Sequence, residues 1–194
     1  MTKSRVNTRY TTLDIIVLAV TGIVWGLLGG PLGYVWQTAM AGAGPIVGAL
    51  FAPFVMSITL GLLLVRKPGA GVAGGIINGM AQWLGGNPLG ISLLLFGLLM
   101  GIGAELPFFL SKYRKFTWQL AFISSGVAQV FALVLAAVMF GWGTLGLGIV
   151  ILTWVITFFA AGVESGLLAY LLCRLIRNSG ALKSLSTAQE QASA

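Results

Sequence analysis

The chain has 194 residues, of which 58% are hydrophobic and only 8% are charged, and its net charge is +7. Soluble domains carry about a quarter charged residues, so this composition indicates a membrane protein. It argues against nucleic-acid binding, which needs basic residues gathered on one face of a soluble fold.

The positions of the basic residues predict the topology. All Lys and Arg residues fall into four clusters, separated by about 45 to 60 mostly apolar residues, enough for two membrane crossings of about 20 residues each. Each pair of crossings returns the chain to the same side, and the positive-inside rule makes that side the cytoplasm. The clusters are Lys3, Arg5 and Arg9; Arg66 and Lys67; Lys112, Arg114 and Lys115; and Arg174, Arg177 and Lys183.

The sequence therefore predicts an all-α membrane protein with six transmembrane helices, both termini in the cytoplasm, and a location in the bacterial cytoplasmic membrane as a multi-pass protein. Thr11 and Asp14 have the spacing of a capping box at the start of the first helix. Residues 1–177 are expected to form one transmembrane domain, and the Ser-, Ala- and Gln-rich residues 178–194 a disordered cytoplasmic tail. In chain order, the expected helices cover about 13–28, 45–65, 70–84, 89–110, 118–140 and 147–172.

The N-terminus allows a second interpretation. Basic residues, an apolar stretch and then Ala39-Met40-Ala41 resemble a secretory signal with a small-residue cleavage site. The apolar run lies far from that site for a signal peptide, and Pro31 intervenes. A retained first helix followed by an external loop is therefore favoured.

The expected outer loops contain no charged residue but are rich in Gly, Pro, Trp and amide side chains. Each hairpin places one tryptophan at its outer end, namely Trp36, Trp83 and Trp142. These either form an interfacial aromatic belt or line a ligand pocket. Tyr34 and Gln37 accompany Trp36, which favours a first loop that folds back as a lid. The loops are expected at about 29–44, 85–88 and 141–144.

Two carboxylates, Glu105 and Glu164, lie within apolar segments. A carboxylate at membrane depth costs several kcal/mol, and it suggests a functional site that faces the bundle interior. The alternatives are a helix cap or a basic partner for Glu105, and a hydrogen bond to a neighbouring Ser or Thr for Glu164. By helical rise, Glu164 is expected near the membrane midplane and Glu105 closer to the cytoplasm.

Amide side chains and glycines add further candidates. Asn78 and Gln82 are four residues apart and share one helix face, and Gln129 lies on the fifth expected helix. These amides either form hydrogen bonds to a ligand or join neighbouring helices by hydrogen bonds. Gly22 and Gly26 form a small-residue stripe that suits close helix packing or docking of a partner membrane protein. Similar stripes occur in the third and fourth expected helices.

The sequence lacks the residues that several kinds of reaction and metal binding require. The chain has no histidine, one cysteine and no Gly-x-x-x-x-Gly-Lys-Ser/Thr pattern. We therefore expect no enzyme activity, no catalytic residues, no metal site, no cofactor and no ATP hydrolysis by this chain.

Three stretches carry a resemblance to a known family. They are the glycine-rich residues 70–79, the Gly-Ala-Glu-Leu-Pro-Phe segment within 101–108, and Gly-Gly-Pro-Leu-Gly-Tyr-Val-Trp at 29–36. The chain resembles the substrate-capture (S) components of energy-coupling factor (ECF) vitamin importers. More narrowly, it is similar to the YkoE family, which is linked to thiamine and its hydroxymethylpyrimidine precursor.

The resemblance implies a vitamin site toward the outer side, a transmembrane coupling (T) subunit and cytoplasmic ATPase subunits as partners. It also implies docking through small residues on the first helix, where Gly22 and Gly26 replace the family's Ala-x-x-x-Ala motif. A proton-coupled transporter that uses the two intramembrane glutamates remains the alternative. The predicted substrate-binding residues are Tyr34, Trp36, Gln37, Asn78, Gln82, Trp83, Glu105, Trp142 and Glu164.

Overall fold

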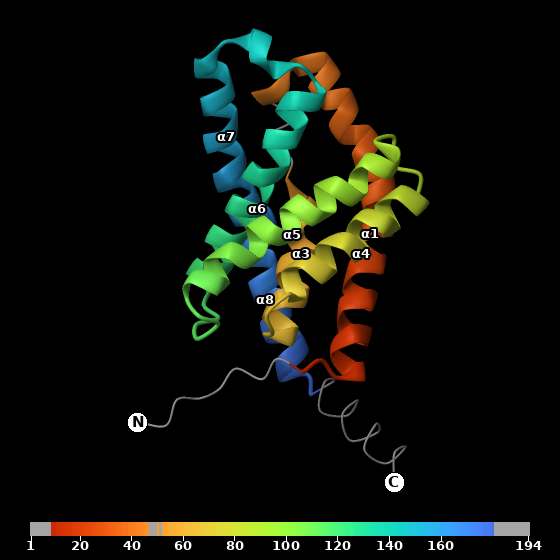
Figure 1. The fold of residues 1–194 in the computed structure, drawn as a ribbon, viewed down its shortest axis with the longest axis vertical. Helices are drawn as coiled ribbons and strands as arrows, with labels where there is room; N and C mark the ends of the chain where they lie inside the picture. Colours follow the sequence, from red (N-terminus) through yellow and green to blue (C-terminus); the bar gives the residue numbers. More distant parts are fainter. Residues whose placement is uncertain (1–8, 47–49, 51, 181–194) are drawn as a thin grey trace.

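The computed structural model describes residues 9–46, 50 and 52–180, and the regular elements in this part of the chain are all helices. The turns η1 and η2 lead directly into α3 and α5, and α7, η4 and α8 follow one another without a break (Figure 1). Apart from the short turn η3, the described residues therefore form six helical segments. The predicted all-α fold is confirmed. The elements are α1 (Thr12–Ala43), η1 (Pro53–Val55), α3 (Met56–Val65), α4 (Ala70–Leu84), η2 (Gly90–Ser92), α5 (Leu93–Leu110), α6 (Trp118–Met139), η3 (Trp142–Leu145), α7 (Leu147–Ala161), η4 (Gly162–Leu167) and α8 (Leu168–Asn178).

Helix α1 is much longer than predicted. Thr11 and Asp14 form the expected capping box, but the helix continues through Pro31 to Ala43 and ends at Gly44, whose φ is 79°. The prediction of an outer loop over 29–44 is therefore wrong. A proline removes only one backbone donor from a helix, whereas a loop in an apolar environment would leave many backbone groups unpaired.

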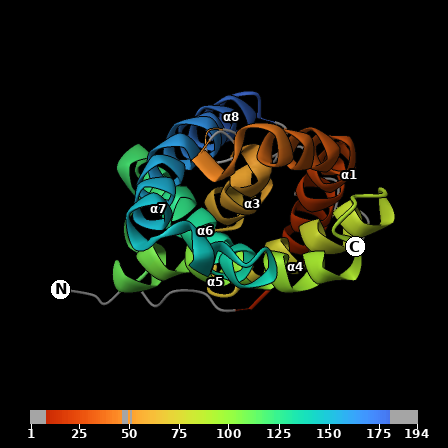
Figure 2. The same ribbon diagram turned by 90° about the horizontal axis from the view of Figure 1, so that it is seen from above.

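The predicted second helix is only partly described by the structure. The segment from Pro53 to Val65 is helical, and α3 ends at Arg66, which adopts the left-handed conformation. Every residue of α3 except Leu64 is buried. Seen from above, α3 lies inside the ring formed by the other helices (Figure 2). This central position explains why so short a helix is so apolar.

Helices α4 and α5 approach until their backbones touch. A Cβ atom at Gly75 would lie 2.1 Å from the carbonyl oxygen of Gly97, and one at Gly79 would lie 2.3 Å from the carbonyl oxygen of Leu93. No side chain fits between the helices at these points. The glycine stripes predicted for these two helices therefore pack against each other within the chain.

The last helical segment contains a π turn, η4, in which Glu164 lies. The sequence predicted one helix over 147–172, and the observed segment runs from Leu147 to Asn178. The expected tail beyond it falls almost wholly outside the described residues.

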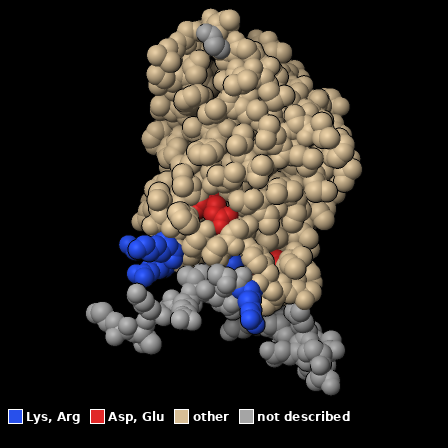
Figure 3. All heavy atoms as spheres, viewed as in Figure 1, with Lys and Arg blue, Asp and Glu red and all other residues tan. Residues whose placement is uncertain are grey.

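Length and charge fit a protein that crosses a membrane several times. Four helices are long and apolar enough to span it, over 12–42, 90–110, 118–139 and 147–178, while α3 and α4 are shorter. The described ends of the chain lie at the same end of the bundle (Figure 1). On the face drawn in Figure 3, Lys and Arg gather at that end, for which the positive-inside rule predicts a cytoplasmic location.

Candidate ligand-binding site

A small cavity of about 40 Å³ lies between the helices in the half of the bundle away from the basic end. Its walls come from α1, α3, α4, α5, α6 and the turn after α4. No Asp, Glu, Lys, Arg or His is among the described residues that line it. The lining residues are Gly33, Trp36, Phe54, Ile58, Asn78, Gln82, Asn87, Leu89, Leu93, Phe96, Gly97, Met100, Gln129, Ala132, Leu133 and Ala136.

Three amide side chains along one wall form a continuous hydrogen-bonded chain. Asn78 donates from Nδ2 to the Oγ of Ser57 at 2.6 Å and accepts at Oδ1 from the Nε2 of Gln82 at 2.7 Å. The Oε1 of Gln82 in turn accepts from the Nδ2 of Asn87 at 3.1 Å. All three amides are buried. This network gives the apolar cavity a fixed polar wall.

Local sequence explains how these amides come together. The four-residue spacing of Asn78 and Gln82 places them on one face of α4. Glycines on α1 leave room for them, because a Cβ at Gly29 would lie 2.8 Å from the Cγ of Gln82 and one at Gly33 would lie 2.3 Å from the Nδ2 of Asn87. After α4, Gly86 adopts a positive φ of 81°, and the chain turns so that Asn87 points back to the wall.

A fourth amide, Gln129 on α6, contributes to the cavity lining away from this chain of hydrogen bonds. Its side chain is only 5% exposed, and its Oε1 has no hydrogen-bond partner among the described residues. Trp36, Phe54 and Phe96 add aromatic surface to the lining. The lining therefore combines aromatic surface with amide groups, which together suit a flat ligand with a polar edge.

Beyond the cavity, at the outer end, lies a wider vestibule of about 440 Å³. Trp36 lines both spaces and therefore lies where they adjoin. The ring of Phe140 lies 6.1 Å from that of Trp36 and 6.5 Å from that of Trp142. Gln37 and Trp142 also line the vestibule. Trp36, Phe140 and Trp142 thus line this open space rather than form only a lipid-facing belt.

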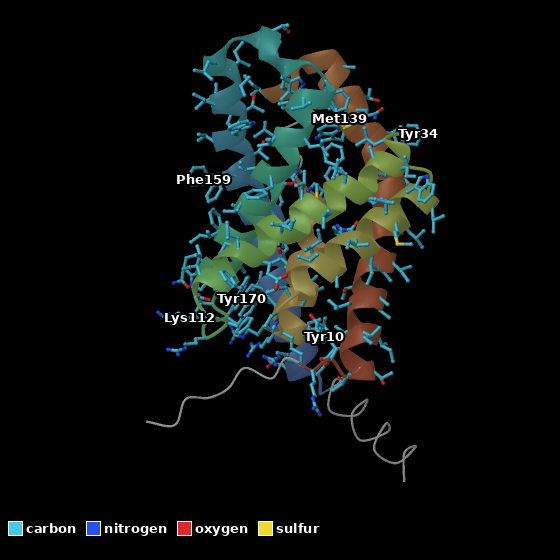
Figure 4. The ribbon with its side chains drawn as sticks, viewed as in Figure 1. Tyr10, Tyr34, Lys112, Met139, Phe159 and Tyr170 are labelled. Carbon is cyan, nitrogen blue, oxygen red and sulfur yellow. The ribbon has the colours of Figure 1, made fainter. Side chains whose placement is uncertain are left out.

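The structure brings some of the predicted substrate-binding residues together and separates others. Trp36, Asn78 and Gln82 line the cavity, and Gln37 and Trp142 line the vestibule. Tyr34 is 58% exposed and points away from the bundle (Figure 4), and Trp83, at 40% exposure, lines neither space. Asn87 was not among the predicted residues, although its place one short turn after Gln82 was a usable signal.

Glu105 lies in the last two turns of α5 and does not line the cavity. Its carboxylate accepts hydrogen bonds from the backbone N–H groups of Gly69 and Val72, the latter at 3.2 Å, and from the Tyr113 hydroxyl at 2.6 Å. It therefore caps the N-terminus of α4, where backbone donors are otherwise unpaired. Burial and the bonded Glu105 carboxylate raise the pKa of Tyr113, and burial and nearby carboxylates raise the pKa of Tyr10 to about 12.

The carboxylate of Glu164 also forms a hydrogen bond to a backbone group. Its Oε2 accepts a hydrogen bond from the backbone N–H of Ala52 at 2.8 Å. The Oγ of Ser165 donates to the backbone carbonyl of Ala52, also at 2.8 Å. The π turn η4 places these two neighbouring side chains on Ala52, just before η1. Neither side chain lines the cavity.

The two glycines predicted for partner docking face the interior of this chain. A Cβ at Gly22 would lie 2.7 Å from the Cγ2 of Ile77, and one at Gly26 would lie 2.4 Å from the Cβ of Ala81. Both glycines therefore allow α1 to pack on α4. The outward face of α1 carries large apolar side chains, among them Ile23 at 46% exposure.

Comparison with known proteins identifies the family of the chain. Residues 13–131, more than half of its length, match a family model described as the permease component of an ABC-type cobalt transport system. The chain belongs to this family. Members of this ABC-type permease family are transport components rather than enzymes, as the sequence predicted. The described residues contain no group of three or more His, Cys, Asp or Glu that could hold a metal ion.

Two known proteins resemble this ABC-type permease component over nearly its whole length. A Bacillus subtilis (strain 168) protein named as an HMP/thiamine permease, YkoE, is 21% identical over 187 residues, which cover 91% of this chain and 89% of the relative. A crystal structure of an S-component of an ECF transporter matches with a TM-score of 0.85 and 20% identity, over 95% of this chain and 98% of the other. The resemblance to S components and the S-component-like fold are confirmed.

Proposed function

We propose that this chain is the substrate-binding S component of an ECF-type importer, and that it captures thiamine or its hydroxymethylpyrimidine precursor from outside the cell. The observation that carries the proposal is the buried, amide-lined cavity beneath the outer vestibule. The similarity to YkoE and the S-component fold support the same assignment.

The cavity chemistry suits an aminopyrimidine ring. Such a ring offers nitrogen acceptors and an amino donor, and amides such as Gln82 and Gln129 carry both kinds of partner. Trp36, Phe54 and Phe96 supply aromatic contact for a flat ring. The thiazolium cation of thiamine would gain about 0.5 to 2 kcal/mol over an aromatic face.

The sizes of the two spaces support entry from the outer side. At about 40 Å³ the cavity is well below the size typical of small-ligand sites, so a ring must displace part of its wall. Trp36 is the wall shared with the vestibule of about 440 Å³. Movement of its indole would join the two spaces into one site of the size typical for small ligands, about 300 to 1,000 Å³.

Energy for transport would come from partner subunits. This sequence has no phosphate-binding loop pattern, so ATP hydrolysis belongs to cytoplasmic ATPase subunits, joined to this chain by a transmembrane coupling subunit. A proton-coupled mechanism is less well supported, because Glu105 and Glu164 both hold backbone N–H groups and neither lines the cavity.

Ligand-induced thermal stabilisation of the purified protein tests this proposal. Thiamine and hydroxymethylpyrimidine are added separately, and the wild-type protein is expected to melt at a higher temperature with at least one of them. Ala132→Leu fills the cavity and should abolish that increase, whereas Ala137→Leu, on the same helix but outside the lining, should keep it. If neither compound shifts the melting temperature of the wild-type protein, the proposal fails.

A further inference from the structure

The amides that line the cavity differ in how fully their polar atoms are used. Asn78, Gln82 and Asn87 are bonded to one another or to neighbouring groups at both ends of their side chains. Gln129 stands apart, since its buried Oε1 has no partner among the described residues. The site therefore keeps one acceptor unused.

An unused acceptor in this position has a cost. A buried polar atom without a hydrogen bond destabilises a protein, and native proteins keep few of them. Next to Gln129, the lining residues of α6 are Ala132, Leu133 and Ala136, and none of their side chains can donate. No described lining residue donates to this oxygen, so a donor on a molecule in the cavity would satisfy it.

The charge of the lining limits what that occupant can be. The described lining residues include no ionisable side chain, and both intramembrane glutamates are engaged elsewhere. A buried ion without a charged partner is costly in such surroundings. An uncharged ligand is therefore favoured over a permanent cation.

We propose that Gln129 is the specificity-determining residue of this cavity, and that its Oε1 accepts a hydrogen bond from an N–H or O–H group of a flat, uncharged ligand. The inference rests on the proposed function, because it assigns the cavity as the capture site. It favours the neutral hydroxymethylpyrimidine over thiamine as the better ligand.

Calorimetric titration of three proteins with three probes tests the assignment. The proteins are wild type, Gln129→Met and the control Gln119→Met, which changes an exposed glutamine of the same helix. The probes are hydroxymethylpyrimidine, its analogue with hydrogen in place of the exocyclic amino group, and thiamine. We expect wild type and Gln119→Met to bind hydroxymethylpyrimidine most tightly of the three probes. Gln129→Met should bind it about tenfold more weakly, with little change for the analogue.

The melting temperature of the ligand-free protein distinguishes a role of Gln129 in ligand recognition from a role in packing. Because Gln129→Met removes an unpaired polar atom, the ligand-free variant should melt no lower than wild type. The assignment is overturned if Gln129→Met binds all three probes as tightly as wild type does. It is also overturned if this variant binds none of the probes and melts at a lower temperature than wild type. A wild-type protein that binds thiamine most tightly would overturn it as well. Absence of binding by wild type to every probe would instead remove the proposed function itself.

Discussion

The Nε2 of Gln82 donates to the Oδ1 of Asn78 at 2.7 Å, so two amides one turn apart on α4 act as a single hydrogen-bonded unit. Asn78 also donates to Ser57 and to the carbonyl of Phe54, at 2.6 and 3.2 Å. Its side chain is thus fully used by the protein, which gives it a structural role beside its place in the cavity wall.

Asn78→Leu is expected to lower the stability of the protein. The substitution leaves the Gln82 amide, the Ser57 hydroxyl and the Phe54 carbonyl without this partner, at about 1 to 3 kcal/mol for each group left unsatisfied. Thermal melting in detergent measures the effect. Gln119→Leu, at an exposed position, should leave the melting temperature nearly unchanged. Equal melting temperatures for the two variants would contradict the assigned role.

Gly75→Ala should separate α4 from α5. The added Cβ would lie 2.1 Å from the carbonyl oxygen of Gly97, which is backbone and cannot rotate away. We expect a loss of about 3 kcal/mol or more in the free energy of unfolding. Gly148→Ala is the matched control, because its Cβ meets nothing within 4 Å, and helix propensity alone should make it neutral or slightly stabilising. A stable Gly75→Ala variant would show that the two backbones are not in contact.

Glu105→Gln should weaken the fold without changing ligand affinity. The glutamine amide can still accept hydrogen bonds from some of the donors around it. The negative charge at the N-terminus of α4 is lost, however, and this should lower the free energy of unfolding by about 1 kcal/mol. Calorimetry should find a dissociation constant within about twofold of wild type, since Glu105 does not line the cavity. A large loss of affinity at unchanged stability would instead place this carboxylate in the ligand site.

Tyr113 should make stability depend on pH in the alkaline range. Burial and the hydrogen bond to Glu105 raise its pKa in the folded protein above the ordinary value of 10.0. Because the folded value is the higher one, its contribution is complete below about pH 10 and is lost as the pH rises through the folded pKa. The gap in melting temperature between wild type and Tyr113→Phe should therefore be constant below pH 10 and narrow above it. A gap that widens above pH 10 would reverse the sign of this coupling.

The sequence predicted the helical framework well and the detailed site only in part. Basic clusters and apolar lengths located the helices because both reflect the membrane directly. Asn78 and Gln82 were identified because amides inside apolar segments are unusual, and Trp36 because Tyr34 and Gln37 accompany it at the expected outer end of the first hairpin. The outer half of α1 was missed, since Pro31 and its neighbouring glycines are typical of a loop, and the apolar surroundings that keep this segment helical leave no local pattern.

The two glutamates show the limit of reasoning from residue type. A carboxylate in an apolar segment indicates an unusual partner, but it does not say whether that partner is a ligand or a backbone amide. For Glu105 the partners lie at the start of α4, more than 30 positions away along the chain. Only the folded arrangement reveals them. Gln129 is the opposite case, because its missing partner becomes visible only when every neighbour is known.

The direct backbone contact between α4 and α5 divides the molecule into a stiff part and a part that can adjust. Without side chains between them, these two helices have no rotamers to rearrange, so their relative position cannot change in small steps. Any widening of the cavity is therefore expected from α1, α3 and α6, which supply its other walls. Half of the binding site would then serve as a fixed template against which the other half closes.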